Sequence, residues 1–340
     1  MKRFKKNGII IILLTAFLMW YTLKDNFAAT IKILGNVNLL WILVALIMFL
    51  IYFLLESLMY KIVINQYNKK YTYKKSLTLN IMTKFFNGIT PFSTGGQPLQ
   101  VYELNRDGVK PTYGTLVTVE QFLIFQTTVV VFAIGSIIIN NIFDIVHADA
   151  FLSKLVVVGF SLNIIVLFAV FLLCTNINLS KKIIHFFIHL LSFLKIVKDE
   201  NKMVEKWNKI CDEYYSGYVQ LLKNGKIIKK CMLIESFSML FMFFVTYFVF
   251  LSLGFHLGDL KLVISTIIAI YAFFVGSFIP MPGGSGGIEY AFVGFFSYYV
   301  GNEYLSPALI IWRFITYYLP MIIGSIVFMV RNKRLSKIKN

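Results

Sequence analysis

Two stretches rich in glycine and proline interrupt a chain that otherwise consists largely of long apolar runs. The first is Thr90-Pro-Phe-Ser-Thr-Gly-Gly-Gln-Pro98, and the second is Pro280-Met-Pro-Gly-Gly-Ser-Gly-Gly287. Proline removes a backbone hydrogen-bond donor and glycine weakens a helix, so both stretches are expected to break helices. Membrane lipid tolerates irregular backbone only where protein buries it or water reaches it. The two breaks therefore predict a substrate pathway inside a membrane protein.

The scarcity of charge places the whole chain in a membrane. Charged residues make up 14% of the sequence and hydrophobic residues 58%, whereas about 25% of an ordinary soluble domain is charged. The sequence thus predicts an all-α polytopic membrane protein that forms one integral membrane domain over 1–340, with about eight crossings. The expected spans are 8–23, 39–60, 115–139, 154–175, 230–253, 261–279 and 307–330, with a shorter one at 288–300.

Basic residues set the expected orientation of these spans. Lys and Arg gather in segments 1–8, 61–84, 176–230 and 331–340. Because segments rich in Lys and Arg stay in the cytoplasm, both termini are expected to be cytoplasmic. An even number of crossings then requires 288–300 to cross, as a half-helix completed by the second break. The apolar start has no small-residue cleavage site, so we expect it to remain as the first span rather than act as a signal peptide.

The chain divides into two pseudo-repeated halves, each with a helix broken by glycine and proline. The first half is 1–175 with its break at 90–98, and the second is 230–330 with its break at 280–287. Basic residues flank the first break on both sides, so we expect a re-entrant hairpin that enters from the cytoplasm and returns. Interrupted segments at corresponding positions of two halves point to a transport site at their interface.

The linker between the halves, 176–229, is expected to be cytoplasmic or interfacial. In the segment 179–198, polar residues recur at spacings of three and four, which is typical of a helix that lies in the membrane surface. His185 and His189 have the i,i+4 spacing of a metal pair. They enclose no Glu and have no evident third ligand, so an interfacial helix is favoured over a metal site.

The sequence offers no catalytic apparatus. It has no nucleotide-binding glycine loop, no Ser-His-Asp candidate and three widely spaced cysteines, which indicate neither disulfides nor a metal site. We therefore predict no catalytic residue, metal or cofactor. The net charge of +17 lies mostly in the expected cytoplasmic segments. It favours anionic inner-leaflet lipids, and not nucleic acid, as partners.

The small residues of the breaks are candidates for binding an anionic lipid head group. Glycine can adopt backbone conformations that expose successive N–H groups, and a helix that begins near Ile288 would add its dipole. Phosphate and carboxylate suit such donors, while close helix packing is the alternative reason for glycine in membrane helices. These candidates are Gly95 and Gly96 in the first break and Gly283, Gly284, Ser285, Gly286 and Gly287 in the second.

Charged residues within apolar runs are further candidates. Arg313 lies inside the last span, where an arginine costs about 2.5–3.5 kcal/mol on insertion scales, so it should face a cavity or a partner. Its guanidinium suits a lipid phosphate, and an ion pair with Glu120 or Glu289 is an equal alternative. Glu120 and Glu289 are the acids expected to meet a cationic head group or a moving proton. Glu56 and Glu235 lie near predicted cytoplasmic helix ends and are expected to be solvated or paired.

These residues resemble a known family. The run from Thr90 to Tyr102, the later Glu120, the run from Pro280 to Glu289, and Arg313 with the later proline of the last span are similar to the lysylphosphatidylglycerol synthase transmembrane family. That family comprises the membrane region of the multiple peptide resistance factor and its short stand-alone relatives. The resemblance covers nearly the whole chain.

The resemblance implies a flippase in a bacterial cell membrane. Such a flippase moves aminoacylated phosphatidylglycerol, of the lysyl type, from the inner to the outer leaflet and contributes to resistance against cationic peptides. In the family, a C-terminal soluble domain transfers lysine from lysyl-tRNA to the lipid. This sequence ends at Asn340, so that domain is expected to be absent and a separate synthase would supply the lipid.

Two positions depart from the family pattern. Many members have an acid after the first Gly-Gly and an arginine after the glutamate of the third span, where this chain has Gln97 and Gln121. Loss of one acid and one base preserves local neutrality and alters the preference for a head group. A polyprenyl-phosphate-linked or other anionic lipid therefore remains an alternative cargo. A membrane enzyme or subunit of the phosphatidylglycerol lysyltransferase type is an alternative of a different class.

Overall fold

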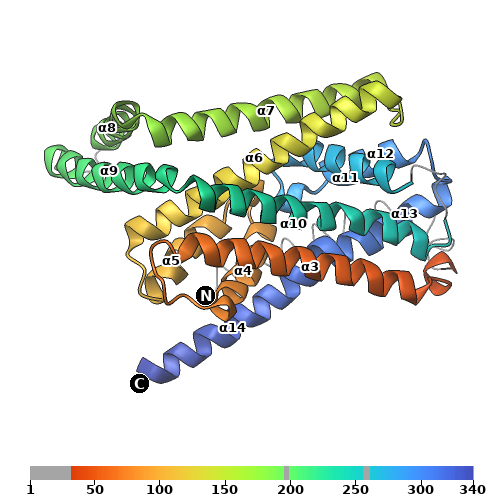
Figure 1. Ribbon diagram of the computed structural model, residues 1–340, viewed down its shortest axis with the longest axis horizontal. Helices are drawn as coiled ribbons and strands as arrows, with labels where there is room; N and C mark the ends of the chain where they lie inside the picture. Colours follow the sequence, from red (N-terminus) through yellow and green to blue (C-terminus); the bar gives the residue numbers. More distant parts are fainter. Residues whose placement is uncertain (1–31, 195–198, 256–260, 340) are drawn as a thin grey trace.

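The computed structural model describes residues 32–194, 199–255 and 261–339, and this part of the chain is helical throughout, with no strand. The helices lie side by side in an elongated bundle (Figure 1). They are α3 (Leu39–Ile64), α4 (Tyr73–Gly88), α5 (Gly96–Arg106), α6 (Pro111–Phe143), α7 (Ala150–Thr175), α8 (Ile177–Phe193), α9 (Glu200–Lys223), α10 (Gly225–Ser252), α11 (Lys261–Ser277), α12 (Gly287–Phe296), α13 (Asn302–Arg313) and α14 (Leu319–Lys339).

Five helical segments of the described residues are long and apolar enough to cross a membrane. They are α3, α6, α7, α10 and the continuous segment formed by α13 and α14, which a short π-helical turn joins at Phe314–Tyr318. Each contains an expected span, so the predicted helices are confirmed. Large apolar side chains such as Val157 and Phe168 remain exposed on α7, as expected for a helix that faces lipid. The expected span at 8–23 lies outside the described residues.

The first break joins two helices that pair antiparallel. Gly96 at the start of α5 donates its N–H to the side-chain oxygen of Asn87 near the end of α4, at 2.8 Å. One turn further from the break, Gln100 donates to the hydroxyl of Thr83 at 3.4 Å. The segment therefore forms the helical hairpin that the sequence predicts.

The second break also joins two helices that pair antiparallel. Gly276 of α11 packs against Ile288 of α12, and the rings of Tyr271 and Phe295 lie 5.5 Å apart, so α12 runs back along α11. Glycines with positive φ turn the chain here, and α12 has only 10 residues. Figure 1 shows the two hairpins, α4–α5 and α11–α12, extending from opposite ends of the bundle.

The centre of the bundle is the pair α3 and α10, which lie side by side (Figure 1). The rings of Trp41 and Phe248 stack at 5.8 Å, and the hydroxyl of Ser238 donates to the carbonyl of Tyr52 at 3.0 Å. The second hairpin packs onto this pair through Phe250 of α10 and Phe296 of α12, whose rings lie 4.5 Å apart. This packing fixes the position of the second break against the core.

Helices α8 and α9 form the linker between the halves. His185 contacts Asn208 at 2.8 Å and His189 contacts Glu200 at 3.1 Å, so the two histidines hold α8 against the start and middle of α9. Lys181 adds an ion pair with Asp212 at 2.6 Å. The two imidazoles thus serve the packing of this pair, and among the described residues no group of three His, Cys, Asp or Glu is arranged to hold a metal.

Candidate functional site

The two breaks build the same backbone turn. Each forms a single 3₁₀ turn, Pro91–Ser93 and Pro282–Gly284, and one residue separates each turn from the Gly-Gly pair that follows it. Phe92 and Gly283 have φ angles of 53° and 61°, and the residues that follow them have 54° and 64°. The two turns pack against each other in the middle of the bundle. The two breaks are therefore alike in backbone geometry as well as in composition.

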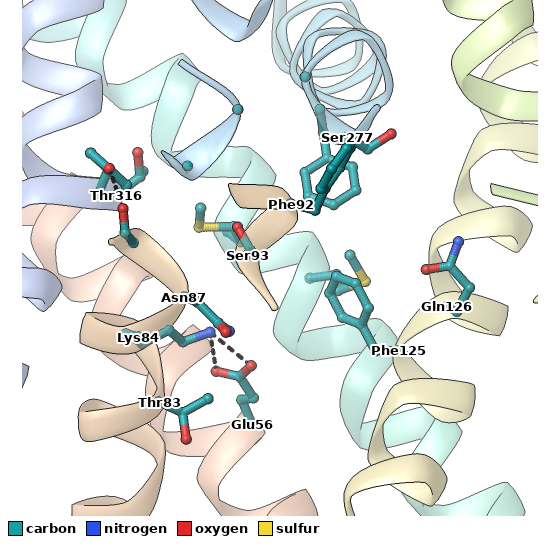
Figure 2. Close-up of a pocket in the computed structure, with 18 of the residues that line it drawn as sticks. Glu56, Thr83, Lys84, Asn87, Phe92, Ser93, Phe125, Gln126, Ser277 and Thr316 are labelled. Carbon is teal, nitrogen blue, oxygen red and sulfur yellow. Dashed lines mark hydrogen bonds and ion pairs between the residues drawn. The ribbon is translucent and has the colours of Figure 1, made fainter. Parts of the chain in front are cut away.

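A cavity of about 770 Å³ lies where the two breaks meet. Its lining combines both turns with side chains of α3, α4, α6, α10 and α11 and of the segment from Trp312 to Pro320. Figure 2 shows Lys84 and Glu56 on one side of this space and Gln126 on the other, with Phe125 between them in the view. Volumes of about 300–1,000 Å³ are typical of small-molecule sites, so the cavity is large enough for a lipid head group.

One lysine and two glutamates form a charged cluster in the lining. Lys84 lies 2.7 Å from one carboxylate oxygen of Glu56 and 2.8 Å from the other (Figure 2). Glu235 of α10 faces the same cavity and is only 1% exposed, and its Oε2 has no hydrogen-bond partner among the described residues. Lys84 can balance one carboxylate, so the cluster carries a surplus acid.

The expectation of a solvated or paired role is met by Glu56, which pairs with Lys84, but not by Glu235, which is buried without an ion-pair partner among the described residues. Both are buried in the cavity wall, at 5% and 1% exposure, and neither reaches the aqueous interface. The reason is that α3 continues to Ile64 and α10 begins at Gly225, beyond the apolar runs at 39–60 and 230–253. The basic residues near these ends extend the helices, so both acids lie deeper than expected.

Two glutamines of the lining also lack partners. Gln121 is 4% exposed, and neither atom of its side-chain amide has a hydrogen-bond partner among the described residues. The same is true of Oε1 of Gln97. Buried polar atoms are nearly always satisfied by protein or ordered water. The lining therefore has three unpaired acceptor atoms, on Gln97, Gln121 and Glu235, and one unpaired donor, on Gln121. This excess of acceptors favours a ligand that donates hydrogen bonds.

Arg313 and Glu289 form an ion pair beside the second break. The guanidinium lies 2.5–2.6 Å from Oε1 of Glu289 and donates to the carbonyl oxygen of Gly283 at 3.2–3.3 Å. Glu289 also accepts the N–H of Gly286 at 2.6 Å. The arginine thus adopts the structural pairing that the sequence leaves as an equal alternative. It still lines the cavity, over the ring of Tyr317.

The glycines of the breaks divide between the cavity and packing. Gly283 and Gly284 line the cavity. Gly287 packs closely against Ile279, and Gly95 against Thr90, so a side chain at either glycine would collide with its neighbour. Gly96, Ser285 and Gly286 likewise lie outside the lining. Close approach to Asn87 and Thr83 explains Gly96, whereas a positive φ of 88° explains Gly286.

Glu120 lies apart from the cavity. Its carboxylate accepts hydrogen bonds from the hydroxyl of Tyr67 and, at 3.4 Å, from Gln66, both near the end of α3. It is 2% exposed and does not contribute to the lining, to which the next residue, Gln121, contributes instead. The structure thus brings together Arg313, Gln97, Gln121, Gly283 and Gly284 of the predicted site residues. It adds Glu56, Lys84 and Glu235.

The apolar helices define a multi-pass membrane protein, and its two hairpins meet at an internal cavity. Residues 8–324 match the family described as the lysylphosphatidylglycerol synthase TM region, and the chain belongs to this family. It is 25% identical over 334 residues to a UPF0104 membrane protein of Archaeoglobus fulgidus, with 94% of each chain covered. A UPF0104 membrane protein of Pyrococcus horikoshii is 21% identical over 347 residues, which cover 97% of this chain and 98% of the relative.

Proposed function

We propose that this protein moves a lipid with a cationic head group between the leaflets of the membrane, and that the lipid is an aminoacylated phosphatidylglycerol of the lysyl type. The observation that carries the proposal is the buried cavity between the two matched breaks, with its surplus carboxylate and unpaired acceptors. An ammonium group donates hydrogen bonds and carries the opposite charge. Membership of the family supports a lipid as the molecule that bears it.

In this proposal, the head group enters the cavity while the acyl chains stay in the lipid. Glu235 and Glu56 face the ammonium groups, and Gln97 and Gln121 bond the glycerol and ester oxygens or the amine. Arg313, at the other end of the lining, faces the phosphate while it keeps its bonds to the second break. The polar and charged groups of the lining lower the cost of moving charge, because an unpaired ion in an apolar medium costs tens of kcal/mol by Born solvation.

The direction of transport belongs to the same proposal. The basic residues of the loops support cytoplasmic termini, and the two hairpins extend from opposite ends of the bundle (Figure 1). In this proposal each hairpin serves one leaflet, and the cavity walls come from described residues between Tyr52 and Val166 and between Glu235 and Pro320. Export of lysyl lipid to the outer leaflet would lower the negative surface charge and repel cationic peptides.

Leaflet exchange in proteoliposomes tests the proposal. The purified chain is reconstituted with lysyl-phosphatidylglycerol, phosphatidylglycerol or a polyprenyl phosphate, and a probe that reacts only in the outer leaflet follows each lipid. We expect selective acceleration of the lysyl lipid. The variant Glu235→Gln should slow it, whereas Glu205→Gln on exposed α9 should not.

Other outcomes identify the alternatives. Movement of the polyprenyl phosphate alone would refute a cationic cargo and favour an anionic lipid. If no lipid moves, and the chain instead forms lysyl-phosphatidylglycerol from lysyl-tRNA and phosphatidylglycerol, the protein is a membrane enzyme. We expect no such product, because no catalytic pattern is found in the sequence.

A further inference from the structure

The cluster of Glu56, Lys84 and Glu235 has one fixed pair and one free acid. Lys84 and the amide of Asn80 both donate to Glu56, the amide at 3.0 Å, so this carboxylate is satisfied. Helix α10 is held against α3 by the bond from Ser238 to Tyr52, which brings Glu235 to the level of this pair. Glu235 itself receives no donor at Oε2 from the described residues.

A buried carboxylate without a partner has two stable forms. Ionised and alone it would cost several kcal/mol, so it either keeps its proton or pairs with a cation. Lys84 is already committed to Glu56 at 2.7 Å. The cation for Glu235 must therefore come with the ligand, and without the ligand this acid is neutral.

We propose that Glu235 holds a proton when the cavity is empty and exchanges it for the ammonium group of a bound lipid. This inference rests on the proposed function. The step breaks the O–H bond of the carboxyl group and passes the proton to the surrounding water, and the carboxylate then pairs with the ammonium. No covalent bond of the lipid changes. Because lipid and proton alternate at one carboxylate, a pH gradient would drive the lipid toward the acidic side.

The other titratable groups around Glu235 leave it as the exchanging site. The hydroxyl groups of Tyr52 and Tyr60 on α3 and the thiol of Cys231 on α10 interact with it, and these groups are neutral at about pH 5–8 in their reference states. Two charged side chains face Glu235, namely Lys84 from α4 and Glu56 from α3. These two compensate each other.

Across the cavity, the facing charges are Arg313 of α13 and its partner Glu289 of α12, which also compensate each other. From α11, the lining contributes no charged side chain, and from α6 it contributes the neutral amides of Gln121 and Gln126. Each cation of the lining is thus matched by a carboxylate other than Glu235. Among the described residues of the lining, Glu235 is therefore the carboxylate that has no oppositely charged partner.

Proton release on binding tests the exchange directly. The probe is a short-chain phosphatidylglycerol esterified with 6-aminohexanoic acid, whose amine resembles that of lysine and stays charged up to about pH 9. Binding enthalpies of the purified full chain are measured in two buffers with different ionisation enthalpies. We expect release of about one proton per bound lipid, and a tenfold gain in affinity per pH unit over the range in which Glu235 is protonated.

Matched controls isolate the amine and the carboxylate. The hexanoyl ester of the same lipid has the chain without the amine and should release no proton. The variant Glu235→Gln keeps the size of the side chain, and it should bind the amine lipid with no proton release and no dependence on pH. Glu120→Gln removes a carboxylate that is equally buried but outside the lining, and it should release the same amount of protons as the wild type.

Different results would refute different parts of the proposal. If the wild type binds the amine lipid without releasing a proton, the exchange of proton for ammonium is refuted, and this measurement requires no variant to fold. Release that persists in Glu235→Gln overturns the assignment to this residue. Leaflet exchange of the lipid, measured at equal pH on both sides of the membrane, tests the proposed transport separately from the proton exchange. If the amine lipid moves between the leaflets without proton release, the proposed transport is supported and the proton exchange is refuted. If the lipid neither binds nor moves, both proposals are refuted.

Discussion

Removal of the Arg313 side chain should destabilise the protein as well as stop transport. The variant Arg313→Ala leaves the carboxylate of Glu289 with only the N–H of Gly286, and it leaves the carbonyl of Gly283 without its two guanidinium donors. The side chains of the pair are 6% and 19% exposed, so water screens them little. Breaking a buried pair on one side costs about 3–5 kcal/mol.

The melting temperature in a single detergent measures this loss. At about 2.1 cal/mol/K of unfolding entropy per residue, a chain of 340 residues loses about 1.4 °C per kcal/mol, so Arg313→Ala should melt roughly 4–7 °C below the wild type. Lys209→Ala is the matched control, because Lys209 pairs with Glu205 at 3.0 Å with both side chains largely exposed. Exposed pairs contribute about 0–1 kcal/mol, so that variant should melt within a few degrees of the wild type.

A double-mutant cycle checks that the loss comes from the pair. The variant with both Arg313→Ala and Glu289→Gln should be less destabilised than the sum of the single variants, with a coupling of about 0.5–3 kcal/mol. An unchanged melting temperature for Arg313→Ala, with transport abolished, would refute the structural reading. The guanidinium would then act on the lipid alone, and the hydrogen bonds to Gly283 would be dispensable.

Three further variants probe other parts of the bundle. Phe92→Gly should be about 1–2 kcal/mol more stable than Phe92→Ala and should melt at a higher temperature, because both lose the ring but only glycine adopts the φ of 53° without strain. Equal melting temperatures of the two variants would contradict this. Glu103→Gln should lower stability by about 3 kcal/mol in the same assay, because this carboxylate is 1% exposed and receives both Arg106 at 2.5 Å and Arg331 at 2.6 Å, and a neutral result would show that the cluster is solvated. Burial raises the pKa of the Cys211 thiol, so wild-type protein should react slowly with a maleimide, whereas Gln97→Cys in the cavity wall should react faster and be protected by lysyl lipid, and equal rates would place Gln97 outside the cavity.

The main helices and both breaks could be predicted because their causes are local. Apolar length defines α3, α6, α7 and α10, and proline with glycine stops the helices that surround 90–98 and 280–287. The course of the chain after the second break is not local. It depends on the positive φ of Gly283, Gly284 and Gly286 and on the close packing of Gly276 with Ile288, and neither follows from hydropathy.

The charged part of the cavity was harder to predict because it depends on helix ends. Glu56 and Glu235 were expected near the interface because the apolar runs stop close to them. The helices continue through Lys61 and from Gly225, since lysine is compatible with a helical turn that leads out of the membrane. Lys84 then meets Glu56 across a hairpin, a contact that requires the tertiary arrangement of α3 and α4.

The pairing of charges explains why one acid of this bundle is left for a ligand. Among the buried carboxylates of the described residues, Glu56 has Lys84, Glu103 has two arginines, and Glu120 has the hydroxyl of Tyr67. Each of these pairs lowers the cost of burial and resists exchange, because removal of the partner would leave a bare charge. Glu235 differs in having an oxygen with no donor, at the wall of the cavity. A cation that enters this space gains most at Glu235, so on the proposed function we expect this residue, and not the paired arginine, to select the head group.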